Sequence, residues 1–288
     1  MRLRALAMAL FLASFAACTV TPQSAPEVGE EYQISKSYET SETGDGSSGN
    51  SRGRDAIVER VIGVRADGLD LEYDLPKETT AEDRARSWQF PFRVFRPSSG
   101  PAQLLNRTEL EARIDAWLKA AGWTREICGR WIFTWNAFRI ECDPQSVIQI
   151  VEAFDLRSAV REGASYQDSE ARGPGTLKRT AVTPDGATFT AAMDIDPNVV
   201  RRARAESDVA VGEIMRKPVT LEAALSKRLK EDVSGTLTVT LVTDARGNIR
   251  QRTKVTKVEI TRPDGRHESR TATETVERRV VSRLTTSR

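Results

Sequence analysis

The stretch TLTVTLVT at 236–243 decides the fold class. Its alternation of apolar and polar residues from Thr236 to Leu241 is typical of a strand with one buried face. Two more strands follow, separated by turns at 244–248 and 263–265, and the last of them ends near residue 277. Because short turns join consecutive strands, these strands are predicted to pair antiparallel. The first strand is predicted to direct three side chains into the core: Leu237, Val239 and Leu241.

A second hairpin and two helices are predicted upstream of this meander. Strands at 177–182 and 188–195 flank the turn sequence Pro-Asp-Gly, and the second of them alternates in the same way. Asp196 is followed by proline and opens a helical segment. A further helix is predicted at 220–234, where leucine recurs every four residues between Thr220 and a glycine that ends the helix.

The N-terminal part of the chain is also predicted to consist mainly of strands. The residues at 31–43 have an extended pattern, and those at 69–75 alternate after an Asp-Gly turn. The apolar run at 56–64 fits either a strand or a helix. Residues 44–54 are nearly all Gly, Ser, Asn, Asp and Arg, so they bury too little surface to offset their ordering entropy. They are predicted to be a mobile loop.

The segment from 88 to 154 contains all five tryptophans and most of the phenylalanines, which predicts a dense core there. A helix with a capping box at Thr108 and Glu111 and a helix that opens at Asp143 are predicted within it. Between them, 131–134 is predicted to pair with 138–141. This pairing places Cys128 opposite Cys142, and a disulfide closing a loop of about fifteen residues stabilises by roughly 3 kcal/mol.

Together these patterns predict an α+β fold. The N-terminal and C-terminal strands are expected to join into one curved antiparallel sheet, resembling a half-barrel. Helices are expected on one side of that sheet, with the Trp-rich α+β segment inserted between the two groups of strands. The predicted helix at 220–234 is expected to cover the concave apolar face.

The first eighteen residues predict export. Arg2 and Arg4 precede a short apolar run, which is typical of a secretory signal and too short to span a bilayer. The run ends in Phe15-Ala16-Ala17-Cys18, which resembles the signal of a bacterial lipoprotein. That resemblance implies that Cys18 is diacylated and becomes the first mature residue. Thr19 follows in place of the aspartate that retains lipoproteins at the inner membrane, which implies an outer-membrane anchor facing the periplasm.

An ordinary secreted protein cut after Ala17 is the alternative. The cysteine count separates the two interpretations, because only Cys18, Cys128 and Cys142 exist and an unpaired thiol is awkward in an oxidising compartment. Acylation of Cys18 removes that thiol and leaves a pair. The predicted organisation is a signal peptide at 1–17, a flexible tether at 18–30, an N-terminal β-meander at 31–87, an aromatic-rich insertion at 88–157 and a C-terminal β-meander with helices at 158–288.

The charge distribution suggests one kind of partner. From residue 201 to the end there are 20 basic and 12 acidic residues, although the mature chain is neutral in total. Arg250, Arg252 and Lys254 are candidate contacts to an anionic envelope polymer or to lipid headgroups. The alternative is that these side chains line the solvated side of an edge strand. No nucleic-acid partner is predicted.

A hydrophobic ligand is the second kind of partner. Trp131 and Trp135 are candidate contacts in a hydrophobic or sugar-stacking pocket, and the alternative is that the tryptophans are core residues. The predicted outline is similar to the half-barrels that carry lipids or lipoproteins in the periplasm, although no motif carries that likeness. A non-enzymatic envelope lipoprotein is therefore the favoured interpretation, and an envelope scaffold that uses its basic C-terminal strands is the alternative.

A serine hydrolase is a third interpretation. Ser51 lies in a G-x-S-x-G sequence and His267, the single histidine, lies downstream in hydrolase order. A nucleophile elbow needs a strained turn on a parallel sheet, whereas Ser51 lies in a low-complexity stretch. With one histidine and two bridged cysteines, no zinc or calcium ligand set is expected, and no cofactor is predicted.

Overall fold

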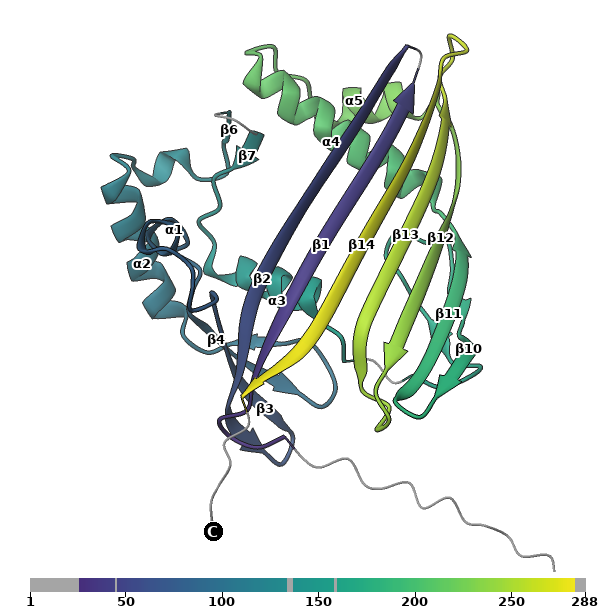
Figure 1. The fold of residues 1–288 in the computed structure, drawn as a ribbon. Coiled ribbons are helices and arrows are strands. Elements are labelled where there is room, and N and C mark those ends of the chain that lie inside the picture. Colours follow the sequence, from purple (N-terminus) through teal and green to yellow (C-terminus); the bar gives the residue numbers. More distant parts are fainter. Residues whose placement is uncertain (1–25, 45, 134–136, 158–159, 283–288) are drawn as a thin grey trace, which may run out of the picture.

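A computed structural model describes residues 26–44, 46–133, 137–157 and 160–282. Ten strands form one antiparallel sheet in the order β10-β11-β12-β13-β14-β1-β2-β3-β4-β5. The sheet is curved and unclosed, and helices accompany it (Figure 1). The predicted α+β fold with a half-barrel-like antiparallel sheet is therefore confirmed. Cys18 and Trp135 lie outside the described residues.

The main sheet consists of long strands near its centre and short strands at one end. Two small hairpins, β6–β7 and β8–β9, lie outside it. The strands of the sheet are β1 (Glu31–Gly44), β2 (Ser47–Arg65), β3 (Gly68–Asp74), β4 (Phe92–Pro97), β5 (Gln103–Leu104), β10 (Lys178–Thr183), β11 (Gly186–Asp194), β12 (Asp232–Thr243), β13 (Ile249–Thr261) and β14 (His267–Ser282). The small strands are β6 (Trp131–Phe133), β7 (Ala137–Arg139), β8 (Ser165–Tyr166) and β9 (Gly175–Thr176).

The two ends of the chain meet at the centre of the sheet. Strand β1 lies between β2 and β14, so the N-terminal hairpin pairs with the last strand of the C-terminal meander. Tyr38, for example, is opposite Gly53 on β2 and Glu274 on β14. The prediction that the N-terminal and C-terminal strands form one sheet is confirmed.

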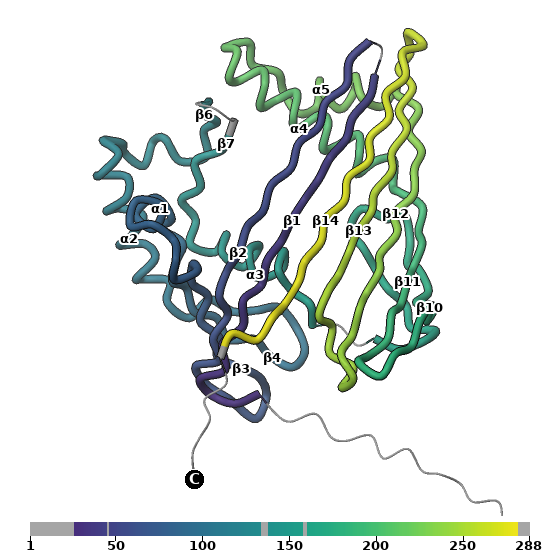
Figure 2. The backbone as a smooth tube through the Cα atoms, viewed as in Figure 1, coloured from purple at the N-terminus to yellow at the C-terminus, as the bar shows by residue number. Residues whose placement is uncertain are grey.

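The prediction of a mobile loop at 44–54 is wrong. Strand β1 extends to Gly44 and strand β2 begins at Ser47, so the described residues of this stretch belong almost entirely to the two strands of the hairpin (Figure 2). Because β1 pairs with β2 on one side and with β14 on the other, backbone hydrogen bonds order this segment although its side chains are mostly exposed. Gly53 suits this pairing, since a Cβ there would lie 2.5 Å from the ring of Tyr38.

Helices cover one face of the sheet, which we call the concave face. Helices α3, α4 and α5 lie behind the sheet in Figures 1 and 2. The helices are α1 (Ala81–Arg86), α2 (Arg107–Ala120), α3 (Val147–Phe154), α4 (Pro197–Ile214) and α5 (Leu221–Arg228), with short 3-10 turns at Arg125–Ile127 and Pro144–Ser146.

Two predicted helix boundaries differ in the structure. Helix α2 is capped by Asn106 and not by Thr108, because the Asn106 side chain accepts from the backbone N–H of Arg93 at 2.9 Å and so ties the helix to β4. Helix α5 ends at Arg228, not at 234, since Val233 pairs with Ile260 inside the sheet. The concave face, which the helix at 220–234 was expected to cover, is therefore covered mainly by α4, and α5 packs against α4.

The core lies between the concave face and the segments that cover it. The predicted inward residues of β12, Leu237, Val239 and Leu241, are at most 1 % exposed. Helix α3 contributes buried residues to the same core. The segment 88–157 contributes β4 and β5 to the sheet itself.

Candidate functional site

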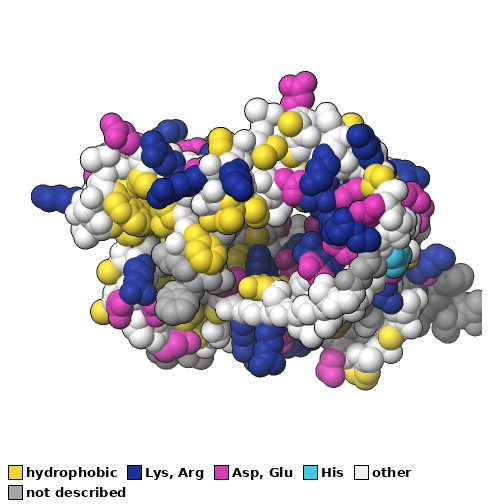
Figure 3. All heavy atoms as spheres, turned by 90° about the horizontal axis from the view of Figure 1, so that it is seen from above, with side chains coloured by type: hydrophobic (Ala, Val, Ile, Leu, Met, Phe, Trp, Pro, Cys, Tyr) yellow, Lys and Arg dark blue, Asp and Glu magenta, His cyan; other side chains and the backbone are white. Residues whose placement is uncertain are grey.

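The concave face has an apolar part that the chain covers itself. Over β11, the β8–β9 hairpin packs so closely that a Cβ on Gly175 would lie 2.8 Å from the side chain of Met193. Over β1, the Phe154 ring of α3 lies 5.5 Å from the Lys36 ammonium. Seen from above, the molecule is hollowed between the sheet and the helices, and charged side chains are visible inside (Figure 3). The open part of the concave face is therefore largely polar.

Arg252 and Lys254 point into this concave side and bind the protein itself. Strand β13 lies between β12 and β14, so the interpretation that these residues line an edge strand is wrong. The Arg252 guanidinium donates to the carbonyl oxygens of Ala153 and Asp155 at 3.2 and 3.1 Å, at the end of α3. Carbonyls at a helix C-terminus carry partial negative charge, so this contact stabilises α3.

The positive charge of Lys254 is balanced by two carboxylates on the segment that crosses over it. Its ammonium lies 3.2 Å from the Glu170 carboxylate and 3.6 Å from that of Asp168. Burial lowers the pKa of Lys254, but the two carboxylates raise it by more than burial lowers it. The pKa of Lys254 therefore lies above its ordinary value. Arg250 is exposed next to the β12–β13 turn. Of the three predicted basic contacts, the structure leaves only Arg250 on an open surface.

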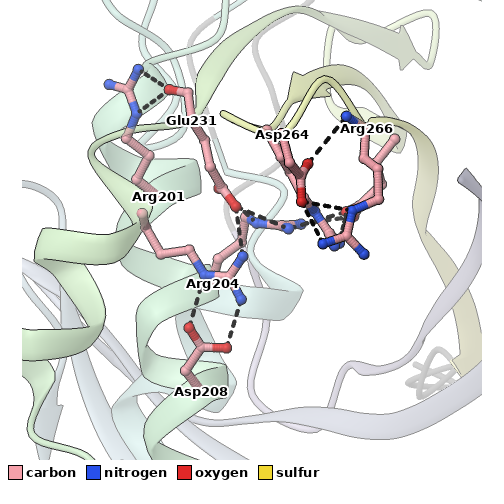
Figure 4. Close-up of polar contacts among 9 residues, drawn as sticks. Arg201, Arg204, Asp208, Glu231, Asp264 and Arg266 are labelled. Carbon is pink, nitrogen blue, oxygen red and sulfur yellow. Dashed lines mark hydrogen bonds and ion pairs between the residues drawn. The ribbon is translucent and has the colours of Figure 1, made fainter. Parts of the chain in front are cut away.

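A network of ion pairs fastens α4 to the upper end of the sheet. The Arg204 guanidinium donates to Glu231 at 3.1 Å and to Glu268 of β14 at 2.7 Å. Arg201 donates to the backbone carbonyl of Glu231 at 2.8 Å (Figure 4). The hydrogen bond from Arg204 lowers the pKa of Glu268. The network fixes the helix that crosses the concave face.

A second charged cluster lies at the lower end of the sheet, around the buried carboxylate of Glu59. The Glu59 carboxylate accepts from Arg157 and Arg278 at 2.6 Å each and from the Tyr73 hydroxyl at 2.6 Å. Burial raises the pKa of Glu59, but the two arginines lower it more, so the net direction is downward. Burial and the Glu59 charge raise the pKa of Tyr73 well above its ordinary range. No titratable pair is left free for acid–base chemistry in this cluster.

The disulfide between Cys128 and Cys142 is present, with 5.6 Å between the Cα atoms. It closes the base of the β6–β7 hairpin, in which Trp131 is opposite Arg139 and Ile132 is opposite Phe138. The predicted pairing of this region is thus confirmed, apart from a shift of its second strand to Ala137–Arg139. Trp131 is half-buried, and its backbone N–H donates to Glu213 of α4 at 3.2 Å.

A trough lies on the uncovered, convex face of the sheet. Cross-strand partners share a face, and Ser37, Glu39, Arg52, Arg54, Thr273 and Thr275 line this face around a volume of about 570 Å³. Arg52 and Arg54 are exposed and form no ion pair with any described residue. Sequence reasoning missed this site because it treated 44–54 as a loop. Two arginines spaced two residues apart would have indicated a shared strand face.

The structure does not bring Ser51 and His267 together. Ser51 is opposite Thr40, which pairs with Ala272, whereas His267 lies five residues along β14. That offset corresponds to roughly 16 Å along the strand. The two residues also face opposite sides of the sheet, and His267 lies 2.9 Å from the Glu259 carboxylate. The geometry of a serine–histidine pair is absent.

Two further kinds of site are not found in the part of the chain that the structure describes. Within it, no group of three or more His, Cys, Asp or Glu side chains is arranged to hold a metal ion. None of the described helices is long and apolar enough to cross a membrane.

Comparisons with known proteins yield distant structural likenesses. No family model matches the sequence, and no curated protein matches it. Lipovitellin, solved in a study of its lipid–protein interactions, is 8 % identical over 91 % of this chain, with a TM-score of 0.41. This chain covers 26 % of the lipovitellin chain, about a quarter of its length.

Two bacterial structures are also similar. A putative outer-membrane lipoprotein-sorting protein domain from Vibrio parahaemolyticus is 8 % identical, with a TM-score of 0.18, over 88 % of this chain and 87 % of that chain. The attachment invasion locus protein Ail of Yersinia pestis is 5 % identical, with a TM-score of 0.20, over 88 % of this chain and 100 % of that chain. At these identities and TM-scores the likenesses indicate no function, and no family membership follows.

Proposed function

We propose that the protein is an exported lipoprotein of the bacterial cell envelope, anchored by acylated Cys18 and acting by binding instead of by catalysis. The observation that carries this proposal is the Cys128–Cys142 disulfide. Disulfides persist in oxidising compartments outside the cytosol. With these two thiols bridged, Cys18 is the one remaining thiol of the chain, and it directly follows the secretory leader.

The anchor is tested by metabolic labelling of the full chain with radioactive palmitate in a bacterial host. The expected result is a labelled protein in the membrane fraction, because two acyl chains are sufficient for stable attachment. The Cys18→Ser variant should lose the label, and the Cys128→Ser variant should keep it. Label that persists in Cys18→Ser, or a chain that remains uncut in the cytosol, contradicts the proposal.

A hydrophobic ligand is part of this proposal, and we place its contact on the surface. The described apolar part of the concave face is filled by the protein's own core, whereas Phe133 and Phe138 of the β6–β7 hairpin are 63 % and 42 % exposed. A soluble fluorescent fatty acid should therefore bind more weakly to a Phe133→Ser, Phe138→Ser double variant than to the parent. Equal binding would place the ligand elsewhere.

Binding of an anionic envelope polymer is the second candidate function, and the convex trough favours it. The previously predicted contacts Arg252 and Lys254 are ion-paired within the protein, whereas Arg52 and Arg54 have no ionic partner among the described residues. Serine and threonine hydroxyls beside them supply hydrogen bonds that suit a sulfated, phosphorylated or carboxylated glycan. Arginine binds such groups in a bidentate manner.

Heparin serves as a probe for this second function. Affinity should fall steeply between low and high salt, because exposed charges are screened. The Arg52→Glu, Arg54→Glu variant should bind at least about tenfold more weakly. An Arg250→Glu, Arg246→Glu variant at the β12–β13 turn is the matched control and should bind like the parent. If only the control variant lost binding, the polyanion site would lie on the C-terminal strands and not in the trough.

A further inference from the structure

The upper half of strand β2 is an open edge inside the sheet. On its inner side β2 pairs with β1 along its whole upper half, whereas on its outer side the pairing with β3 begins only at Val58. No described strand lies on the outer side of this upper half (Figures 1 and 2). We call residues 48–56 the open edge, and at about 3.4 Å per residue they extend over roughly 30 Å. A stretch of backbone as long as a strand is therefore open to pairing.

Alternate residues of the open edge direct their backbone groups outward. In an antiparallel pair, every second residue exchanges hydrogen bonds with the partner strand, and the residues between them face away from it. The backbone N–H of Val61 donates to the carbonyl of Glu30 on the β1 side, and no register shift interrupts the β1–β2 pairing. Odd-numbered residues of β2 therefore bond to β1. The N–H and C=O groups of the even-numbered residues, Arg52 and Arg54 among them, face the open side, and no described backbone group pairs with them.

The strands at the two ends of the sheet are much less suited to pairing. Strand β10 has six residues, its pairing with β11 contains a register shift, and Pro184 follows it. Strand β5, at the other end, consists of two residues. Short, bulged or proline-flanked strands are common means of preventing unwanted pairing at an edge. The open edge of β2 contains neither a proline nor a bulge, so it can accept another strand.

Charge on the convex face of the open edge is positive. The charged side chains of the open edge on this face are Arg52 and Arg54, which are exposed and form no ion pair with a described residue. Glu39 is the nearest acidic residue on this face, but it lies on the inner strand β1, and the two arginines outnumber it. Because cross-strand neighbours share a face, an added strand would place side chains directly opposite these arginines. Acidic side chains at every second position fit this face.

The concave face of the open edge favours apolar side chains instead. Asp55 is exposed there and forms no ion pair with a described residue, so it would repel a further carboxylate. The Tyr38 ring, whose residue is 44 % exposed, lies across Gly53, where a Cβ would be 2.5 Å from the ring. This ring offers an apolar contact to a side chain of an added strand. The best-fitting partner segment therefore alternates acidic and apolar residues.

We propose that the open edge binds an extended acidic segment of a partner protein, which joins the sheet as an antiparallel strand. In complexes of this kind main-chain hydrogen bonds supply affinity, and side chains at alternate positions supply specificity. A second copy of this chain fits less well, because antiparallel pairing of two open edges centred on Gly53 would set arginine opposite arginine. The inference goes beyond the proposed function, since it requires neither the anchor nor a glycan. It shares Arg52 and Arg54 with the convex trough, so heparin and the partner segment should compete.

Synthetic peptides test the proposal on a chain that begins at Thr19 and so contains every described residue. A labelled peptide of about ten residues that alternates glutamate and valine should bind, as measured by fluorescence polarisation. The same peptide with lysine in place of glutamate should bind at least about tenfold more weakly. N-methylation of the glutamates should weaken binding as much, because it removes the N–H groups that face β2. N-methylation of the valines should leave binding unchanged, since their N–H groups face away from β2.

A protein variant separates strand addition from charge attraction. Asn50→Pro removes one outward N–H and keeps both arginines, and proline is tolerated on an edge strand. It should bind the glutamate peptide at least about tenfold more weakly and bind heparin like the parent. The matched control Asn50→Ser keeps the N–H and should bind both ligands like the parent. If thermal unfolding shows that Asn50→Pro does not fold, the methylated peptides decide, because they are tested on the parent chain.

Three outcomes overturn the proposal. The first is that the parent does not bind the glutamate peptide. The second is that both methylated peptides bind equally well, because charge alone would then account for binding and only the polyanion site would remain. The third is a dimer of the parent, measured by sedimentation, that the glutamate peptide fails to dissociate, because a second copy would then occupy the open edge. None of these results depends on acylation of Cys18, so the anchor and the added strand can fail separately.

Discussion

The two ends of the β1–β2 hairpin have the same backbone structure and very different surroundings. At the lower end Ile34, Ile57 and Val61 are buried under α3 and neighbouring segments, and Glu59 is held by two arginines. At the upper end Arg52 and Arg54 are exposed. The lower end is ordered by side-chain packing and the upper end by continued strand pairing. Arg52 and Arg54, which are exposed and form no ion pair with a described residue, therefore lie at the upper end, where a partner could reach them.

The largest expected effect comes from removing the charge at the lower end. The Glu59→Gln variant leaves the partly buried side chains of Arg157 and Arg278 without their shared counter-ion, so the free energy of unfolding should fall by about 3–5 kcal/mol. The matched control is Glu39→Gln at the upper end, where the carboxylate is exposed and forms no ion pair with a described residue. Urea unfolding of both variants measures the difference. Equal free energies of unfolding for the two variants would show that Glu59 stabilises the lower end no more than Glu39 stabilises the upper end.

The β6–β7 hairpin is held at its base by a disulfide, and both of its phenylalanines are exposed instead of packed in the core. Replacing both cysteines by alanine in Cys128→Ala, Cys142→Ala should lower the free energy of unfolding by about 3 kcal/mol, because the unfolded chain regains loop entropy. Denaturant titrations with and without reducing agent measure the effect. The parent should respond to the reducing agent and the double variant should not. An equal response would mean that the bridge is not what stabilises this region.

Acid should weaken the lower end selectively. Because the pKa of Glu59 is lower in the folded protein than in the unfolded chain, its contribution is present above the unfolded value of about 4.3 and is lost as the pH falls through the folded value. Each unit of lowering is equivalent to about 1.4 kcal/mol. Melting temperatures between pH 7 and pH 3 should therefore fall more steeply for the parent than for Glu59→Gln. Parallel curves would show that Glu59 does not titrate in this way.

The smallest effect is expected at the upper end. The Arg52→Ser, Arg54→Ser variant should change the free energy of unfolding by less than about 0.5 kcal/mol, since exposed side chains without ionic partners contribute little. The same urea titrations measure it. A loss of several kcal/mol would indicate that these arginines hold the strand pairing, and would remove the reason for assigning them to a ligand.

Local pattern predicted the strands whose faces alternate and the turns that join them. The alternation in β11 and β12, the Pro-Asp-Gly turns and the Asp196 cap were all visible, because each depends on residues close together in the chain. The same holds for the disulfide, which followed from a short hairpin and a count of three cysteines. The leader and Cys18 are also local signals, and their consequences remain predictions.

Contacts between distant residues decided the rest. Residues 47–54 form a strand because they pair with β1, and β1 is itself held on its other side by β14. Composition cannot reveal that β1 has this second partner, which lies more than 200 residues away in the chain. Helix α5 stops at Arg228 because Val233 pairs with β13. Arg252 and Lys254 become internal ion-pair partners only when α3 and residues 168–170 cross over them. Whether a charge is free or neutralised depends on which segments the fold brings next to it, and pairing across the sheet is a property of the whole chain.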